Sequence, residues 1–136
     1  MNKSTLPQFA SGLVWFRRDL RAHDQAALYH ALRQCKQVHA AFVFDTDILR
    51  ELPRQDRRVE FIHESLQALD AELRALAGQA EAGLIVRHGA GAAEITRLAQ
   101  ELGVQAVFTN HDDEPAAIAR DLKARGKLAE LGIALK

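Results

Sequence analysis

Short apolar runs alternate with longer amphipathic stretches along this chain from residue 12 onward. The runs are rich in Val, Ile and Phe, and they are continuous, which is typical of strands that are covered on both faces. They occupy positions 13–16, 38–44, 84–86, 106–109 and 133–135. Because strands that alternate with helices pair in parallel, this order predicts an α/β domain with a five-stranded parallel sheet between two layers of helices.

Four helices are predicted between these runs. The clearest is the second, whose apolar residues step by three and four along one face: Val59, Ile62, Leu66, Leu69, Leu73 and Leu76. We expect the first helix to begin at Asp24 as its N-cap and to bury Ala27, Leu28, Ala31 and Leu32. The third should bury Ile95, Leu98 and Leu102 and end at Gly103, while the fourth begins at Pro115 with Ile118 and Leu122 as its apolar positions and weakens at Gly126.

Length and charge restrict the class of protein. With 136 residues and a net charge of zero, the chain has the size of one domain and lacks the basic excess of a surface that binds nucleic acid. The single cysteine, Cys35, lies in a helical pattern beside Leu32 and is interpreted as a small buried apolar residue. With no partner for a disulfide, a reducing, cytoplasmic location is the simplest expectation, and no apolar run is long enough to span a membrane.

The two ends of the chain differ from its centre. Residues 1–11 are polar and are expected to form a flexible leader, with the domain occupying 12–136. The last predicted strand begins at Ile133, close to the end of the sequence. We therefore expect the domain to be cut from a longer polypeptide.

Polar segments follow the first four apolar runs. They are Arg17 to Arg21, Asp45 to Asp47, His88 to Gly91, and Asn110 to Glu114. Ligands of an open parallel sheet bind at the carboxyl ends of its strands, so these segments form the candidate site. Each also has a structural interpretation, because Arg and Asp form ion pairs, and Asp residues cap helices and turns.

Several kinds of active site lack their residues. The segment from Gly89 to Glu94 imitates a dinucleotide fingerprint, but Glu94 replaces its third glycine and brings a carboxylate where phosphates would lie. The six histidines and one cysteine show no metal-ligand spacing, so no metal is predicted. Without a nucleophile elbow or a phosphate-binding loop, we expect no catalytic residue in this chain.

The segment LVWFRRDLR at positions 13–21, with Asp24 after it, resembles the opening signature of the DNA photolyase and cryptochrome family. Three further segments agree in order and spacing: 42–45 with 48–49, 57–62, and 110–115 with 120–121. The resemblance covers nearly all of the chain from Gly12 onward. It implies the N-terminal α/β domain of that family, a Rossmann-like three-layer α/β/α sandwich with strand order 3-2-1-4-5.

The family resemblance also implies a function. The full-length parent would be a deoxyribodipyrimidine photo-lyase, a carbon–carbon lyase that repairs cyclobutane pyrimidine dimers in DNA with blue light. Damaged DNA and FAD would bind to a C-terminal helical domain that is absent here, so we expect this fragment alone to be inactive. This domain would instead bind the antenna pigment, which absorbs light and passes the energy to FAD.

The resemblance suggests which residues would hold the pigment. Deazaflavin-binding members match this chain at seven positions: Phe42, Val43, Phe44, Asp45, Arg58, Asp112 and Arg120. Because alternate residues of a strand face opposite sides, one of each neighbouring pair in 42–45 must face away from the pigment. Folate-binding members carry an Asn-Glu pair in the fourth helix, where this chain has Ala116 and Ala117. An 8-hydroxy-5-deazaflavin or a flavin is therefore expected in preference to a folate.

Two alternatives remain open. A cryptochrome, which is a blue-light photoreceptor of the same fold, would share this half of the chain. A stand-alone nucleotide-binding α/β module would share only the topology.

Overall fold

The computed structural model describes residues 8–17, 20, 25–45, 57–77, 83–110 and 115–136, and within them the side chains of all but 45, 57–61, 77 and 115–117. Five strands form one parallel sheet: β1 (Phe9–Phe16), β2 (Cys35–Asp45), β3 (Leu84–Gly89), β4 (Ala106–Phe108) and β5 (Ala134–Leu135). Their order is β3-β2-β1-β4-β5, which confirms the expected topology. β1 begins at Phe9, so residues 9–11 of the expected leader belong to the sheet.

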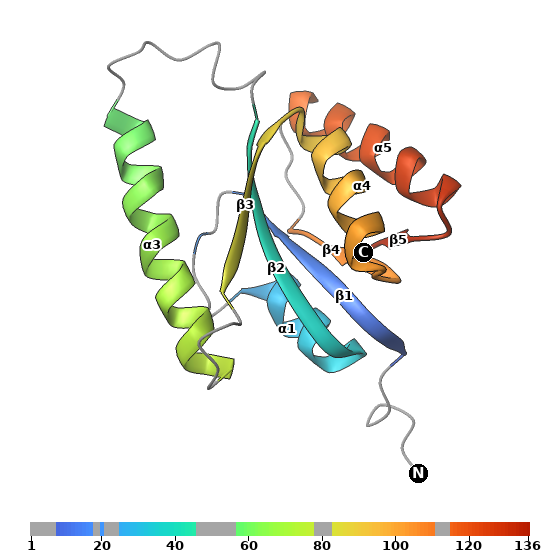
Figure 1. Ribbon diagram of the computed structural model, residues 1–136. Coiled ribbons are helices and arrows are strands. Elements are labelled where there is room, and N and C mark those ends of the chain that lie inside the picture. The colour runs from blue at the N-terminus through green and yellow to red at the C-terminus, as the bar shows by residue number, and fades with distance from the viewer. Residues whose placement is uncertain (1–7, 18–19, 21–24, 46–56, 78–82, 111–114) are drawn as a thin grey trace.

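Helices cover both faces of this sheet (Figure 1), as the three-layer prediction required. On one face, α1 (Ala26–Gln34) and α3 (Arg57–Ala77) pack on β1, β2 and β4 through a core that includes Leu28, Leu69 and Phe108. On the other, α4 (Gly91–Leu102) and α5 (Pro115–Glu130) pack on β1, β2 and β4 through Ile95, Leu98 and Leu128. No helix within the described ranges is long and apolar enough to span a membrane.

Helices α3 and α4 follow the predicted apolar stripes. In α3, Leu66, Leu69 and Leu73 are buried, whereas Leu76 at the last turn is exposed. In α4, Ile95 and Leu98 are buried and Leu102 packs against the same core. Gly103 ends α4 with a left-handed backbone at φ 69°, a conformation that glycine adopts without steric cost.

The prediction for α1 was wrong in three respects. Its N-cap is Gln25, whose side-chain oxygen accepts a hydrogen bond from the backbone N–H of Ala27; Asp24 lies outside the described residues. Leu32 is 55% exposed, because the buried stripe of this short helix passes through Leu28 and Ala31 instead. Cys35 is not helical but is the first residue of β2, since the strand follows the helix without a loop.

The predicted apolar stripe of α5 was also wrong. Ile118 and Leu122 are exposed, and the residues that face the core are Ala124 and Leu128. The helix continues through Gly126 to Glu130, so this glycine does not end it. The described side chains of α5 that reach the core therefore lie in the C-terminal half of the helix.

Candidate functional site

The carboxyl ends of the strands meet at one edge of the sheet, which we call the carboxyl edge. The structure places the last residues of β1, β2 and β3 there in register, with Phe16 beside Phe42, and Asp45 beside Gly89. Helices α3, α4 and α5 follow β2, β3 and β4 in the chain, and each begins on the side of the sheet where those strands end (Figure 1). Ring-bearing ligands of open parallel sheets bind at such an edge.

Six of the seven residues named from the family resemblance belong to elements that meet there. Phe42, Val43 and Phe44 end β2 together with Asp45, while Arg58 is the second residue of α3. Arg120 lies in the second turn of α5 and is half-buried. Asp112 lies outside the described residues, as do the side chains of Asp45 and Arg58. Contacts between these residues and a ligand therefore stay a prediction.

The three strand residues face different sides. Phe42 and Phe44 pack with Leu66 of α3, whereas Val43 lies in the core under α4 and α5. All three side chains are buried. Of this group, only residues on one face could line any single ligand site, as the strand alternation predicted.

Two histidines surround the ring of Phe44. His88 stacks on it with ring centroids 4.8 Å apart and planes 14° apart, and His63 of α3 lies at 5.0 Å. Phe42 meets the same ring edge to face at 5.0 Å. His88 begins the polar segment 88–91 that was predicted as part of the candidate site, and the structure pairs it with Phe44 in the β2–β3 register. His63 was not predicted to belong to this region.

Arg17 forms an ion pair at the same edge. Its Nη1 donates to Asp121 Oδ1 of α5 at 2.6 Å, and its guanidinium lies 4.9 Å from the centre of the Trp15 ring. The structural interpretation of this arginine, an ion pair, is therefore the one that the structure supports. The remaining charged residues of that segment, at 18–19 and 21, lie outside the described residues.

The glycine-rich segment after β3 does not present a free phosphate site. Gly89 has φ 146°, and a Cβ there would lie 2.8 Å from Cγ of Glu94. Glu94 is mostly buried in the first turn of α4 and accepts a hydrogen bond from Arg97 at 2.6 Å. A carboxylate close to this helix N-terminus opposes phosphate binding.

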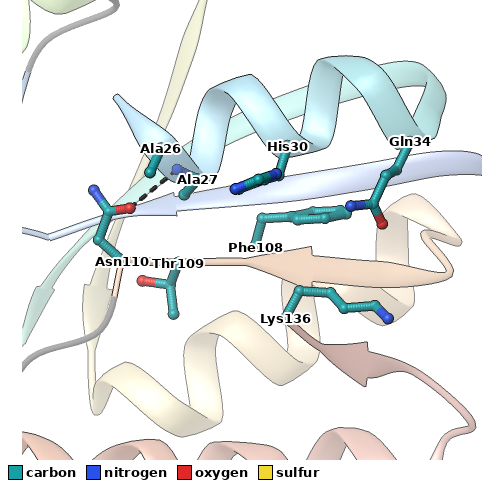
Figure 2. Close-up of a pocket in the computed structure, with 8 residues that line it drawn as sticks. All are labelled: Ala26, Ala27, His30, Gln34, Phe108, Thr109, Asn110 and Lys136. Atoms are coloured by element: carbon teal, nitrogen blue, oxygen red, sulfur yellow. Dashed lines mark hydrogen bonds between the residues drawn. The ribbon is translucent and has the colours of Figure 1, made fainter. Parts of the chain in front are cut away.

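A pocket of about 430 Å³ opens between α1 and β4 (Figure 2). It is lined by Ala26, Ala27, His30, Gln34, Phe108, Thr109, Asn110 and Lys136. None of the seven residues named above is among them. Asn110 Oδ1 accepts from the backbone N–H of Ala27 at 3.0 Å, and its Nδ2 donates to Gln25 Oε1 at 2.6 Å. This amide ties the start of α1 to the end of β4, a role that the sequence did not reveal.

Titratable groups in the described part of the chain form no metal centre. No group of three or more His, Cys, Asp or Glu side chains there could hold a metal ion. Cys35 is buried, and burial raises the pKa of its thiol, which disfavours the reactive thiolate.

The comparisons with known proteins agree with one another. The family model for DNA photolyase matches residues 12–136. A deoxyribodipyrimidine photo-lyase of Streptomyces griseus is 36% identical over 120 residues, which cover 88% of this chain and 26% of that enzyme. Cryptochrome-1 of Aedes aegypti is 32% identical over 117 residues, which cover 82% of this chain and 21% of that protein.

A solved structure supports the same family. The photolyase of Sulfolobus tokodaii, described with two FAD molecules and an implied novel light-harvesting cofactor, has a TM-score of 0.79 and 34% identity. The match covers 93% of this chain and 28% of that one. The chain thus spans about a quarter of the length of these relatives. With its sheet order, helix layers and matched residues, this chain belongs to the DNA photolyase family and corresponds to the N-terminal α/β domain.

Proposed function

We propose that this chain is the antenna-binding domain of a deoxyribodipyrimidine photo-lyase. The observation that carries the proposal is the match of residues 12–136 to the family, with relatives that include such an enzyme and a photolyase with a light-harvesting cofactor. In the parent enzyme, FAD in a C-terminal helical domain would supply the electron that splits a pyrimidine dimer. Damaged DNA would bind to that domain, and this chain alone would be inactive.

The residues at the carboxyl edge suit a flavin-like pigment. Asp45 and Asp112 would accept hydrogen bonds from ring or ribityl groups, because ionised carboxylates are acceptors only. Arg58 and Arg120 would donate planar pairs of hydrogen bonds to carbonyl or phosphate oxygens. The placement of Asp45, Arg58 and Arg120 on elements that converge at one edge supports this group as one site.

A flavin or deazaflavin is the pigment class that we propose. The second FAD of the Sulfolobus tokodaii photolyase supports a flavin, since that relative is 34% identical to this chain. The alanines at positions 116 and 117 provide no hydrogen bonds of the kind a pterin requires. We further propose a cytoplasmic setting for the parent, consistent with one buried cysteine.

A cryptochrome is the second candidate, favoured by relatives such as that of Aedes aegypti. Blue-light illumination of dimer-containing DNA with the protein that carries this chain separates the two. We expect the number of dimers to fall under light and to stay constant in darkness, because repair needs the excited flavin. A protein that binds FAD yet leaves the dimers intact under light would contradict the photolyase proposal and favour the cryptochrome.

A further inference from the structure

The ion pair between Arg17 and Asp121 joins two elements at the carboxyl edge. Arg17 directly follows β1, and Asp121 lies in the second turn of α5, 104 residues later. The two side chains are only 18% and 17% exposed. Three other ion pairs among the described residues, Arg74–Asp70, Arg87–Glu101 and Arg97–Glu94, each include a side chain that is more than a third exposed. A shielded ion pair of this kind is less weakened by solvent than an exposed one.

The first half of α5 has little other contact with the core among its described side chains. Ile118 and Leu122 are exposed, whereas Ala124 and Leu128 in the second half are fully buried. Asp121 lies three residues before Ala124, so it extends the sheet-facing stripe of the helix toward the carboxyl edge. Among the described side chains of this half, at 118–122, no apolar one is buried, and the ion pair joins this part of α5 to the end of β1.

Arg17 is itself held in place. Its guanidinium lies over the ring of Trp15, whose side chain is buried in the core under α4 and α5. Cation–π stacking limits the directions in which the guanidinium can point, and a guanidinium donates in a fixed planar geometry. The second turn of α5 is thus joined, through Arg17, to the end of β1.

We propose that Arg17 is a positioning residue, which acts through Asp121 to hold the first half of α5, and with it Arg120, at the carboxyl edge for pigment binding. This inference rests on the proposed antenna function. Arg120 is the neighbour of Asp121 in the chain, so loss of the ion pair would release the backbone that carries it. Arg17 need not touch the pigment.

Asp121→Asn tests the proposal, with Glu101→Gln as the matched control, since it neutralises an exposed ion pair on α4. Backbone hydrogen exchange should rise in a peptide covering 118–124 of the Asp121→Asn protein, and stay unchanged in α4. In the protein that carries this chain, the Kd for FMN or 8-hydroxy-5-deazaflavin should rise about tenfold, which corresponds to about 1.4 kcal/mol. Arg17→Lys keeps the positive charge but removes the planar guanidinium with its paired N–H donors, and should give the same changes to a smaller degree.

The outcomes separate the two proposals. If the wild-type protein binds neither pigment, the antenna function fails and the positioning role fails with it. If it binds pigment and Asp121→Asn binds with unchanged Kd, only the positioning role is overturned. Unchanged exchange in 118–124 would overturn it as well, because the ion pair would then not hold the helix. Equal losses of affinity in Glu101→Gln would show a general charge effect and would also overturn it.

Discussion

Replacing Leu128 with Ala is expected to lower the free energy of unfolding by about 3 kcal/mol, as measured for buried leucines. Leu128 is fully buried between α5 and the sheet, in one core with Leu13 and Val107. Removal of its side chain leaves a cavity that close-packed neighbours fill only in part. Urea unfolding followed by circular dichroism measures the change.

Leu122→Ala is the matched control, because it makes the same chemical change on the same helix. Leu122 is 62% exposed, so its replacement should change the unfolding free energy by no more than about 0.5 kcal/mol. Comparable losses in both variants would contradict the orientation of α5 described above.

Gly12→Ala is expected to cost about 2 kcal/mol, because the core at this point has no room for a methyl group. A Cβ on Gly12 would lie 2.5 Å from Cys35 Sγ and 3.1 Å from Cε1 of Phe108. Gly12 lies in β1 and is itself buried, so the strand cannot move away from both neighbours without disturbing its pairing with β2 and β4.

The same substitution in a Cys35→Ala background identifies the cause. Without the sulfur, the closest clash is removed, and Gly12→Ala should then cost about 1 kcal/mol or less, a coupling of the kind seen between residues in contact. A cost that is the same in both backgrounds would show that the contact with Cys35 is not responsible.

The sheet could be predicted from the sequence because its strands are continuous apolar runs, whose position in the chain is clear without knowing which face is buried. Each observed strand overlaps a predicted run, and Gly103 marked the end of α4 as expected. The strand order came from the family resemblance, since periodicity alone does not say which strands are neighbours.

The face of α5 could not be predicted because two stripes of the helix were available. Ile118 and Leu122 form one, and Ala124 with Leu128 forms the other, at the same spacing of four residues. Size favoured the first stripe, but the structure buries the second and brings the small Ala124 close to the core. Intrinsic hydrophobicity is a weak guide where an alanine makes the close contact.

The candidate site was predicted at the level of its elements and not of its contacts. Polar segments after the strands predicted a site at the carboxyl edge, and this location stays a prediction. The pairing of Arg17 with Asp121, and of Asn110 with the start of α1, joins residues more than 80 positions apart. No local pattern in the sequence contains such pairings, because they depend on how helices are placed over the sheet.

Pigment titration of the protein that carries this chain, followed by pigment fluorescence, tests most directly whether the carboxyl edge is an antenna site. We expect binding of 8-hydroxy-5-deazaflavin or FMN in preference to a reduced folate. Arg58→Ala should raise the Kd about tenfold or more, while its effect on stability stays within about 0.5 kcal/mol. Arg125→Ala, which removes an exposed arginine from the far half of α5, should leave the Kd unchanged. Preferential binding of the folate, or an unchanged Kd in Arg58→Ala, would contradict the site proposed here.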